Sequence, residues 1–527
     1  MTTAHPAWED LYAWDQPDPG VIFPLRDVRD VQRLGHLYPV LHGRPLDAVL
    51  RHARKLGAKS VVVETRYIDP DYRSEYTAFY SKTFSSVSDT AHRLHFFATA
   101  IEEGHPLGDL PEAKDAGYIG YCVIRPNTIS RVSRTMLPPL PDDRAAVRCV
   151  ISQTVHVFGQ PFQIEGAVPF LQQDALLGRC AHVAAWICHA MLAAKDQLRV
   201  LPVAAFSLAA DPSLSHARQL PSQGLTDAQT MQILRSSGVS PTAYLVKELN
   251  GDAQEYRLPV WARDKRYLNP SYRHPEHPMM RALCRYLDSG IPVLVNVDEH
   301  SFVVLGYRRV ADDELGERVE FIRHDDARGP YKWVDDPLAD PVGRRDSEQA
   351  WRSMIVPLPE KLWLPAASAE AAGGRGLREV AHEKAQGGSP QAAAFLAALD
   401  RHEVELRTFA ITSTAFKKAA LGRLPIEVVR AYRMLRCPRY VWVTEAILRD
   451  QRHQPKCVVG EVVLDATSGE FAPNLLAVHI PGHVLWQQTD GSTDSHLPPE
   501  TPYASAGVGP VLGVANDQQP GRDGGDA

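Results

Sequence analysis

Cysteine is scarce in this chain, and its few copies follow no pattern. The 527 residues include seven, which are Cys122, Cys149, Cys180, Cys188, Cys284, Cys437 and Cys457. Their number is odd, they are widely scattered and no two form a Cys-x-x-Cys pair, which argues against a disulfide framework and a zinc ribbon. Free thiols in this arrangement are typical of a reducing compartment, so we expect a cytoplasmic protein.

Long apolar runs and a strong charge of either sign are also missing. No hydrophobic run approaches the roughly 20 residues of a membrane-spanning helix. The first residues, MTTAHPAWEDLYAWDQ, lack the basic and apolar segments of a secretion signal. The formal net charge is −6, so there is no broad basic surface of the kind that nucleic acid requires. These absences predict a protein that binds neither nucleic acid nor membrane, and no motif indicates a cofactor or a metal ion.

Hydrophobic patterning divides the chain into three structured regions, a linker and a tail. The linker is rich in small residues and glycine, and the tail in glycine, proline, aspartate and glutamine. Such compositions bury too little apolar surface to offset the entropy lost on ordering. The predicted divisions are a mixed α/β region over 1–150, a central domain over 151–364, a linker over 365–390, a C-terminal α+β domain over 391–485 and a disordered tail over 486–527.

The segment 283–331 carries the densest signals. A helix-like stretch, LCRYLDSG, precedes the strand-like stretches IPVLVNV, HSFVVLGYRRV and RVEFIRHDD. His300 opens the middle strand, Asp325 closes the last one, and the turn near 312–316 lies midway between them. Two residues equidistant from a hairpin turn lie opposite each other, so we expect the His300 imidazole beside the Asp325 carboxylate. A histidine oriented by a carboxylate is half of a nucleophilic site.

Cys180 is the candidate nucleophile. It stands at the start of the helix predicted within QQDALLGRCAHVAAWICHAML. The other residues on the same face of that helix are apolar. Unpaired backbone N–H groups at a helix N-terminus lower the pKa of a thiol and can hold the oxyanion formed on attack at a carbonyl. Gln172 and Gln173 lie just upstream, and we favour Gln173 as a second donor to that oxyanion. Cys188, two turns into the helix, is expected to be a small buried hydrophobe.

The pieces occur in the order found in papain-like cysteine peptidases, and the chain resembles in particular the bacterial peptidases that process bacteriocin leader peptides. The matching pieces are Gln173, CAHVAAW, GLTDAQTMQILRSSG, LDSGIPVLVNV, HSFVVLGY and DDARG, within about 165–335. The resemblance implies an α+β fold with a papain-like core, in which a cysteine-led helix packs on an antiparallel sheet. It also implies Cys180 as nucleophile, His300 as base, Asp325 as orienting acid and Gln173 as oxyanion donor.

Two details differ from the resembled family. Gln173 precedes Cys180 by seven positions, one more than is usual there. Asp326 follows Asp325 where proline is common, so either aspartate could orient the histidine. Alternation along the strand favours Asp325, with Asp326 turned towards the loop.

Two other sets of residues compete with this site. Cys437, Asp465 and His479 form a rival nucleophilic set, although Cys437 precedes a proline outside any helix start. His274 and His277 are close enough in sequence to share a metal ion, but their proline-rich loop favours a surface position.

The function indicated by the first site is that of a thiol hydrolase. Its substrate class would be a protein or peptide, cleaved by a peptidase, isopeptidase or amidase reaction that needs no cofactor and no metal. A transglutaminase-type acyl transferase would use the same triad. A catalytically silent papain-like binding module is the alternative from another class, and the oligomeric state is open.

Overall fold

The computed structural model describes residues 20–84, 86–102, 104–110, 117–127, 129–196, 198–214, 219–245, 274–297, 300–312, 316–334, 351–488, 491–497 and 502–507. Contacts divide the chain into two compact units. Unit 1 comprises 1–249, 290–306 and 322–360, and unit 2 comprises 250–289, 307–321 and 361–527. Both contain helices and antiparallel strands, so the α+β class predicted from the sequence is confirmed.

The first sheet of unit 1 has seven strands in the order β1-β2-β3-β4-β5-β7-β6. Amphipathic helices α2 and α3 bury their apolar sides in a core shared with its strands. Strand β7 pairs with β5, for example at Thr135↔Phe170, so the predicted domain boundary at residue 150 is wrong. The elements are β1 (Gly20–Pro24), α2 (Val28–His36), α3 (Arg44–Lys55), β2 (Ser60–Tyr67), α4 (Pro70–Ala78), η2 (Tyr80–Lys82), β3 (Ala91–Phe97), η3 (Leu107–Asp109), β4 (Tyr118–Ile124), β5 (Val132–Leu137), η4 (Pro141–Asp143), β6 (Ile151–Val157) and β7 (Gln160–Phe170).

The second sheet contains the predicted hairpin and has the order β12-β11-β10-β9-β13-β8. Helix α6 packs against β6, β7 and β9. Helix α8 begins with a capping box between Thr226 and Gln229. The tip of the β10–β11 turn, 313–315, lies outside the described residues. The elements are α6 (Cys180–Asp196), α7 (Val203–Ala209), η5 (Pro212–Leu214), α8 (Asp227–Ser236), β8 (Ser240–Leu245), β9 (Val293–Asn296), β10 (Ser301–Asp312), β11 (Gly316–Asp325), β12 (Gly329–Val334) and β13 (Ser353–Leu358).

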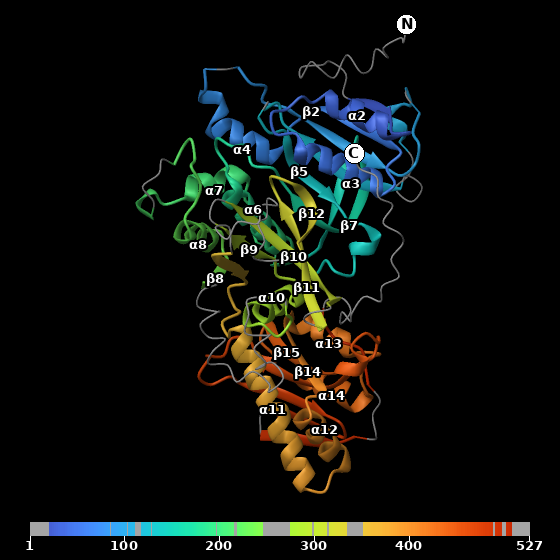
Figure 1. The fold of residues 1–527 in the computed structure, drawn as a ribbon, viewed down its shortest axis with the longest axis vertical. Coiled ribbons are helices and arrows are strands. Elements are labelled where there is room, and N and C mark those ends of the chain that lie inside the picture. The colour runs from blue at the N-terminus through green and yellow to red at the C-terminus, as the bar shows by residue number, and fades with distance from the viewer. Residues whose placement is uncertain are drawn as a thin grey trace. The chain divides into compact units, whose positions relative to one another are not determined.

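Unit 2 is built on a meander sheet in the order β14-β15-β16-β17-β18-β19. Helix α11 packs on β14 to β17, and α14 contacts β18 (Figure 1). The elements are α10 (Pro278–Asp288), α11 (Ala366–Gln386), α12 (Pro390–Asp400), β14 (Val404–Thr412), α13 (Ser413–Ala420), α14 (Ile426–Met434), β15 (Tyr440–Leu448), η9 (Arg449–Gln451), β16 (Val458–Asp465), β17 (Leu475–Ile480), β18 (His483–Gln488) and β19 (Gly491–His496).

The predicted linker over 365–390 is wrong, because most of it is helix α11. Its glycines allow close packing instead of flexibility. A Cβ on Gly373 would lie 2.5 Å from the Thr444 side chain, and one on Gly376 would lie 2.5 Å from Leu475. Small residues at helical spacing therefore form a flat face that lies directly on the sheet.

The predicted disorder over 486–527 is wrong for its first part. Strands β18 and β19 pair along their lengths, and Tyr503 forms an isolated bridge with Val458. Leu497, Tyr503 and Ala506 belong to the apolar core of unit 2. The remainder of this prediction, 508–527, lies outside the described residues.

Candidate active site

Cys180 is the first residue of α6, as the sequence predicts. The rest of the helix face that carries it is buried, including Ala184, Ile187 and Met191. Cys180 itself is partly exposed, whereas Cys188 is fully buried, and burial raises the pKa of the Cys188 thiol. Cys180 is therefore a thiol at a helix N-terminus that solvent reaches, and Cys188 is a core residue.

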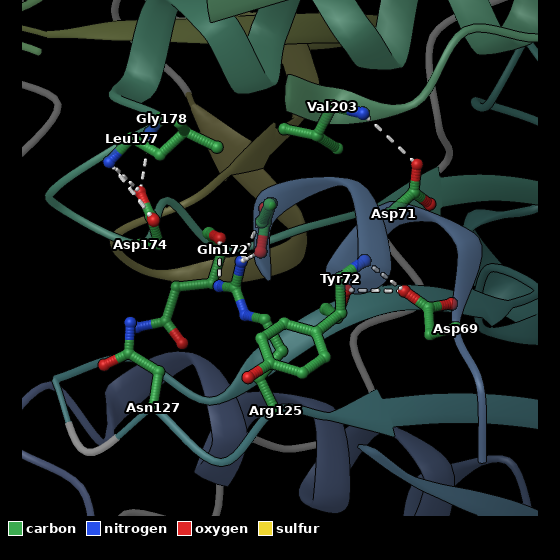
Figure 2. Close-up of polar contacts among 12 residues, drawn as sticks. Asp69, Asp71, Tyr72, Arg125, Asn127, Gln172, Asp174, Leu177, Gly178 and Val203 are labelled. Carbon is green, nitrogen blue, oxygen red and sulfur yellow. Dashed lines mark hydrogen bonds and ion pairs between the residues drawn. The ribbon is translucent and has the colours of Figure 1, made fainter. Parts of the chain in front are cut away.

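A capped turn precedes the nucleophile. The Asp174 carboxylate accepts from the backbone N–H groups of Leu177 and Gly178 at 2.9 and 2.6 Å (Figure 2). The Tyr80 hydroxyl donates to the same carboxylate at 2.7 Å, and the Asn127 amide donates to that hydroxyl at 2.6 Å. These buried contacts fix the backbone that leads into Cys180.

A buried ion pair holds the other end of this segment. Arg125 Nη1 donates to both carboxylate oxygens of Glu75, at 3.0 and 2.9 Å, and its Nη2 donates to the Gln172 carbonyl at 2.7 Å (Figure 2). The Gln172 side chain is also engaged, because its Nε2 donates to the His42 carbonyl at 2.9 Å. Gln172 is thus a structural anchor, and Gln173, which stands between two anchored residues, lines the cavity that contains Cys180.

Removing Arg125 should destabilise unit 1 severely. Arg125→Met would leave Glu75 and the Gln172 carbonyl without their buried donor, and breaking a buried pair typically costs about 3–5 kcal/mol of unfolding free energy. Urea unfolding measures the loss. The double variant Glu75→Leu/Arg125→Met should recover a large part, because a buried pair replaced by apolar groups leaves no lone charge. A loss below about 1 kcal/mol in the single variant would contradict this account of the anchor.

His300 and Asp325 meet as the hairpin predicts. His300 directly precedes β10, Asp325 is the last residue of β11, and His300 Nε2 lies 3.0 Å from Asp325 Oδ1. Burial alone would lower the pKa of His300. The hydrogen bond with Asp325, a contact with Cys180 and the two nearby carboxylates outweigh it and raise that pKa to about 11. The imidazole therefore carries a proton at neutral pH, with the thiol beside it.

The prediction that Asp326 turns towards the loop is wrong. Its Oδ1 lies 3.6 Å from His300 Nε2, and its side chain is 2 % exposed. Burial, together with the charge of Asp325, raises the pKa of Asp326 to about 7. Both aspartates therefore face the histidine.

Arg323 is a third charged neighbour, which the sequence patterns did not assign to the site. Its Nη2 lies 3.1 Å from Asp325 Oδ2, and both side chains are buried. Burial would raise the pKa of Asp325, but the His300 hydrogen bond and the Arg323 charge lower it overall. Asp325 is therefore a carboxylate shared between an imidazole and a guanidinium.

The site opens into a polar cavity of about 640 Å³. Cys180, His300 and Gln173 lie on its wall with the stretch 223–228, which connects to α8. Asn296 lies on the same wall, where its amide donates to Asp227 at 2.9 Å and its oxygen accepts from Ser301 at 2.7 Å. Three of the four predicted site residues thus share one cavity, and Asp325 lies behind the histidine.

His300, Asp325 and Asp326 also form the one group of potential metal ligands found among the described residues, with donor atoms within 4.8 Å of one another. Arg323 and the protonated imidazole supply two positive charges opposite the two carboxylates. Arg323 and His300 therefore already supply counter-charges to the ionised carboxylates of this cluster. We interpret it as the acid–base part of the site, and the expected independence of metal stays a prediction.

The rival sets have other partners. The His479 ring lies 3.2 Å from the Tyr503 hydroxyl, and Asp465 closes a turn by accepting from the Thr467 N–H at 2.8 Å. The imidazole of His277 accepts from the Met279 N–H and caps α10. These contacts explain each residue without a shared site.

Comparisons with known proteins do not assign the chain to a family. No family model matches the chain, and no curated protein matches it either. Within the described ranges, no helix combines the length and apolar character needed to cross a bilayer. The candidate site therefore rests on its own geometry.

Proposed function

We propose that this protein is a cysteine-dependent hydrolase that cleaves an amide bond in a protein or peptide through Cys180, His300 and Asp325. The observation that carries the proposal is the position of His300. Its imidazole lies between a partly exposed thiol at a helix N-terminus and a buried carboxylate 3.0 Å away. This is the arrangement that activates a cysteine nucleophile.

The proposed reaction has two halves, formation of a thioester on Cys180 and hydrolysis of that thioester. In the resting pair the thiol proton of Cys180 is already on His300, whose Nε2 is held by Asp325, so Cys180 attacks as a thiolate. The thiolate attacks the carbonyl carbon, and the oxyanion accepts hydrogen bonds from N–H groups at the start of α6 and from the Gln173 amide. The imidazolium then protonates the leaving amine as the C–N bond breaks, which leaves a thioester on Cys180. Water, deprotonated by His300, attacks the thioester and releases the acid.

A papain-like core is the finer fold proposal. Its support is the packing of α6, led by Cys180, against β9 and β7, with His300 directly before β10 and Asp325 at the end of the neighbouring strand β11. The volume and polarity of the cavity favour an extended peptide over a small apolar ligand. A transglutaminase-type transfer would differ only in the acceptor, an amine in place of water.

Iodoacetamide labelling at pH 6 tests the proposal. An ordinary thiol is almost fully protonated at that pH, whereas a thiolate–imidazolium pair reacts. We expect Cys180 to be alkylated on the order of 100-fold faster than Cys284 and Cys437, the other two partly exposed cysteines, of which Cys437 has a thiol pKa raised by burial. Mass spectrometry of the seven cysteine peptides gives each rate within one sample.

Cys180→Ala should remove the fast label and leave the slow ones unchanged. Equal rates at all three partly exposed cysteines would refute the proposal and favour a catalytically silent module. If the fast label is found, incubating the protein with a peptide library and an amine distinguishes hydrolysis from acyl transfer by the mass of the product.

A further inference from the structure

A row of charged and polar side chains crosses the middle of the unit 2 sheet. Four residues lie directly opposite one another on consecutive strands: Arg407, Glu445, Glu461 and His479. All four are buried, and Glu445, Glu461 and His479 are fully buried. Two carboxylates directly opposite each other in a sheet repel. Such a row therefore lowers the stability of the fold unless its charges are paired, and an otherwise unfavourable row can be retained because it recognises a ligand.

The row is covered by the short segment 502–507. Tyr503 bridges Val458: its N–H donates to the Val458 carbonyl at 2.9 Å, and its carbonyl accepts from the Val458 N–H at 3.0 Å. Besides this isolated bridge, the segment is held by its contacts with the row and by Tyr503 and Ala506, which are buried in the apolar core of unit 2.

Glu445 is satisfied by this segment. Its Oε2 accepts from the Ser505 hydroxyl at 2.6 Å, and its Oε1 accepts from the Ala506 N–H at 2.7 Å. Arg407 Nη1 donates to the same hydroxyl at 2.8 Å. Without the segment, a carboxylate in the middle of the sheet would lose both of these donors, which is costly for a buried charge.

The remaining contacts select particular side chains. The Tyr503 ring stacks on the His479 ring, with centroids 5.4 Å apart. The Arg423 guanidinium lies 5.3 Å from the centre of the Tyr503 ring. Arg423 pairs with Glu461 at 2.9 Å and also donates to the Ala504 carbonyl at 3.3 Å. At Gly507 a Cβ would approach the Arg407 guanidinium to 3.0 Å. The surface thus favours an aromatic residue, serine two positions later and glycine two positions after that.

We propose that this face of the unit 2 sheet is a binding site for an extended peptide of the pattern Tyr-x-Ser-small-Gly, and that 502–507 occupies it in cis. Main-chain pairing supplies general affinity and the charged row supplies specificity, which is how peptide sites at sheets work. A separate peptide of the same pattern would bind in trans when the chain's own segment is weakened. The proposal is independent of the thiol chemistry proposed for Cys180.

Fluorescence polarisation with a labelled peptide, Pro-Tyr-Ala-Ser-Ala-Gly, tests this in the full-length chain. A covalently attached segment acts at an effective concentration in the millimolar range, so wild-type protein should bind the peptide weakly. Tyr503→Ala/Ser505→Ala should bind it at least about tenfold more tightly. A peptide with alanine in place of serine should bind the same variant about tenfold more weakly. No binding by the folded variant, or equal binding of both peptides, would overturn the proposal.

Amide hydrogen exchange on the wild-type chain tests the same idea without a variant that must fold. A segment that releases as a ligand exposes the amides of Val458 and Ala506 together, while the amides of neighbouring core strands stay protected. We expect those two amides to exchange at least about tenfold faster than the amides of β15 and of the rest of β16, which begins at Val458. Protection equal to that of the core strands would show that 502–507 is a permanent part of the sheet and would exclude the proposal.

Discussion

Replacing His300 by glutamine should lower the rate of Cys180 alkylation at pH 6 about 100-fold. The imidazole has a pKa raised to about 11, so it stays protonated across the neutral range and stabilises the thiolate beside it. Without it, Cys180 should react at pH 6 no faster than the other partly exposed thiols. Turnover of any amide substrate should fall at least as far, because the same group protonates the leaving amine.

The pH profile gives this prediction a second readout. In the wild type, alkylation should change little between pH 5 and pH 9, since the positive charge on His300 is lost only as the pH approaches 11. In His300→Gln the rate should rise about tenfold per pH unit up to the pKa of the thiol. His156→Gln is the matched control, because this histidine is exposed on β6. A wild-type profile that already rises tenfold per unit would show that no ion pair exists.

The site was predictable because its parts stand at the ends of elements with strong local signals. Cys180 opens an apolar helix, and His300 and Asp325 flank a hairpin whose turn lies midway between them. Pairing geometry in a hairpin depends on counting residues, which the sequence permits. Gln173 was preferred over Gln172 from order alone, and packing provides the reason, since Gln172 is bound on both its carbonyl and its amide.

Asp326 was misplaced because alternation was extended one residue too far. Strand β11 ends at Asp325, and the chain then turns, with the Arg328 N–H donating to the Asp325 carbonyl at 3.0 Å. In a turn the side chains no longer alternate between two faces, so residue 326 can face the same histidine as residue 325. Arg323 could not be assigned to the site, because its partner depends on this same strand end.

The domain map failed where composition and packing disagree. Glycine in 365–390 indicated flexibility, but Gly373 and Gly376 let helix α11 lie close to the sheet. Similarly, hydrophobic patterning predicted a boundary at 150, whereas β7 pairs back onto β5. Both features depend on distant partners, which local patterns do not specify.

Asparagine at position 325 should reduce turnover far more than asparagine at position 326. Asp325 accepts from His300 at 3.0 Å and fixes the ring with its other nitrogen towards Cys180, whereas Asp326 lies farther away at 3.6 Å. Loss of the orienting acid in a serine triad costs about 10⁴ in turnover. In a cysteine site the ion pair is partly preformed, so we expect a loss on the order of 10² to 10³ for Asp325→Asn.

Asp326→Asn should instead act mainly through pH. Its carboxyl pKa is raised to about 7, so its negative charge, which stabilises the imidazolium, is present above that pH and is lost as the pH falls through it. The asparagine variant should therefore resemble the wild type at pH 5 and fall below it, within about tenfold, at pH 8.5. Turnover and Cys180 labelling, each measured at both pH values, compare the two variants. Asp325→Asn also leaves Arg323 without its carboxylate partner at 3.1 Å. Circular dichroism is therefore needed to show that each variant is folded. A larger loss in Asp326→Asn would make Asp326 the orienting acid. Wild-type activity in both would mean that the hairpin contributes the base but no acid, since a neutral amide at either position would then suffice to hold the ring.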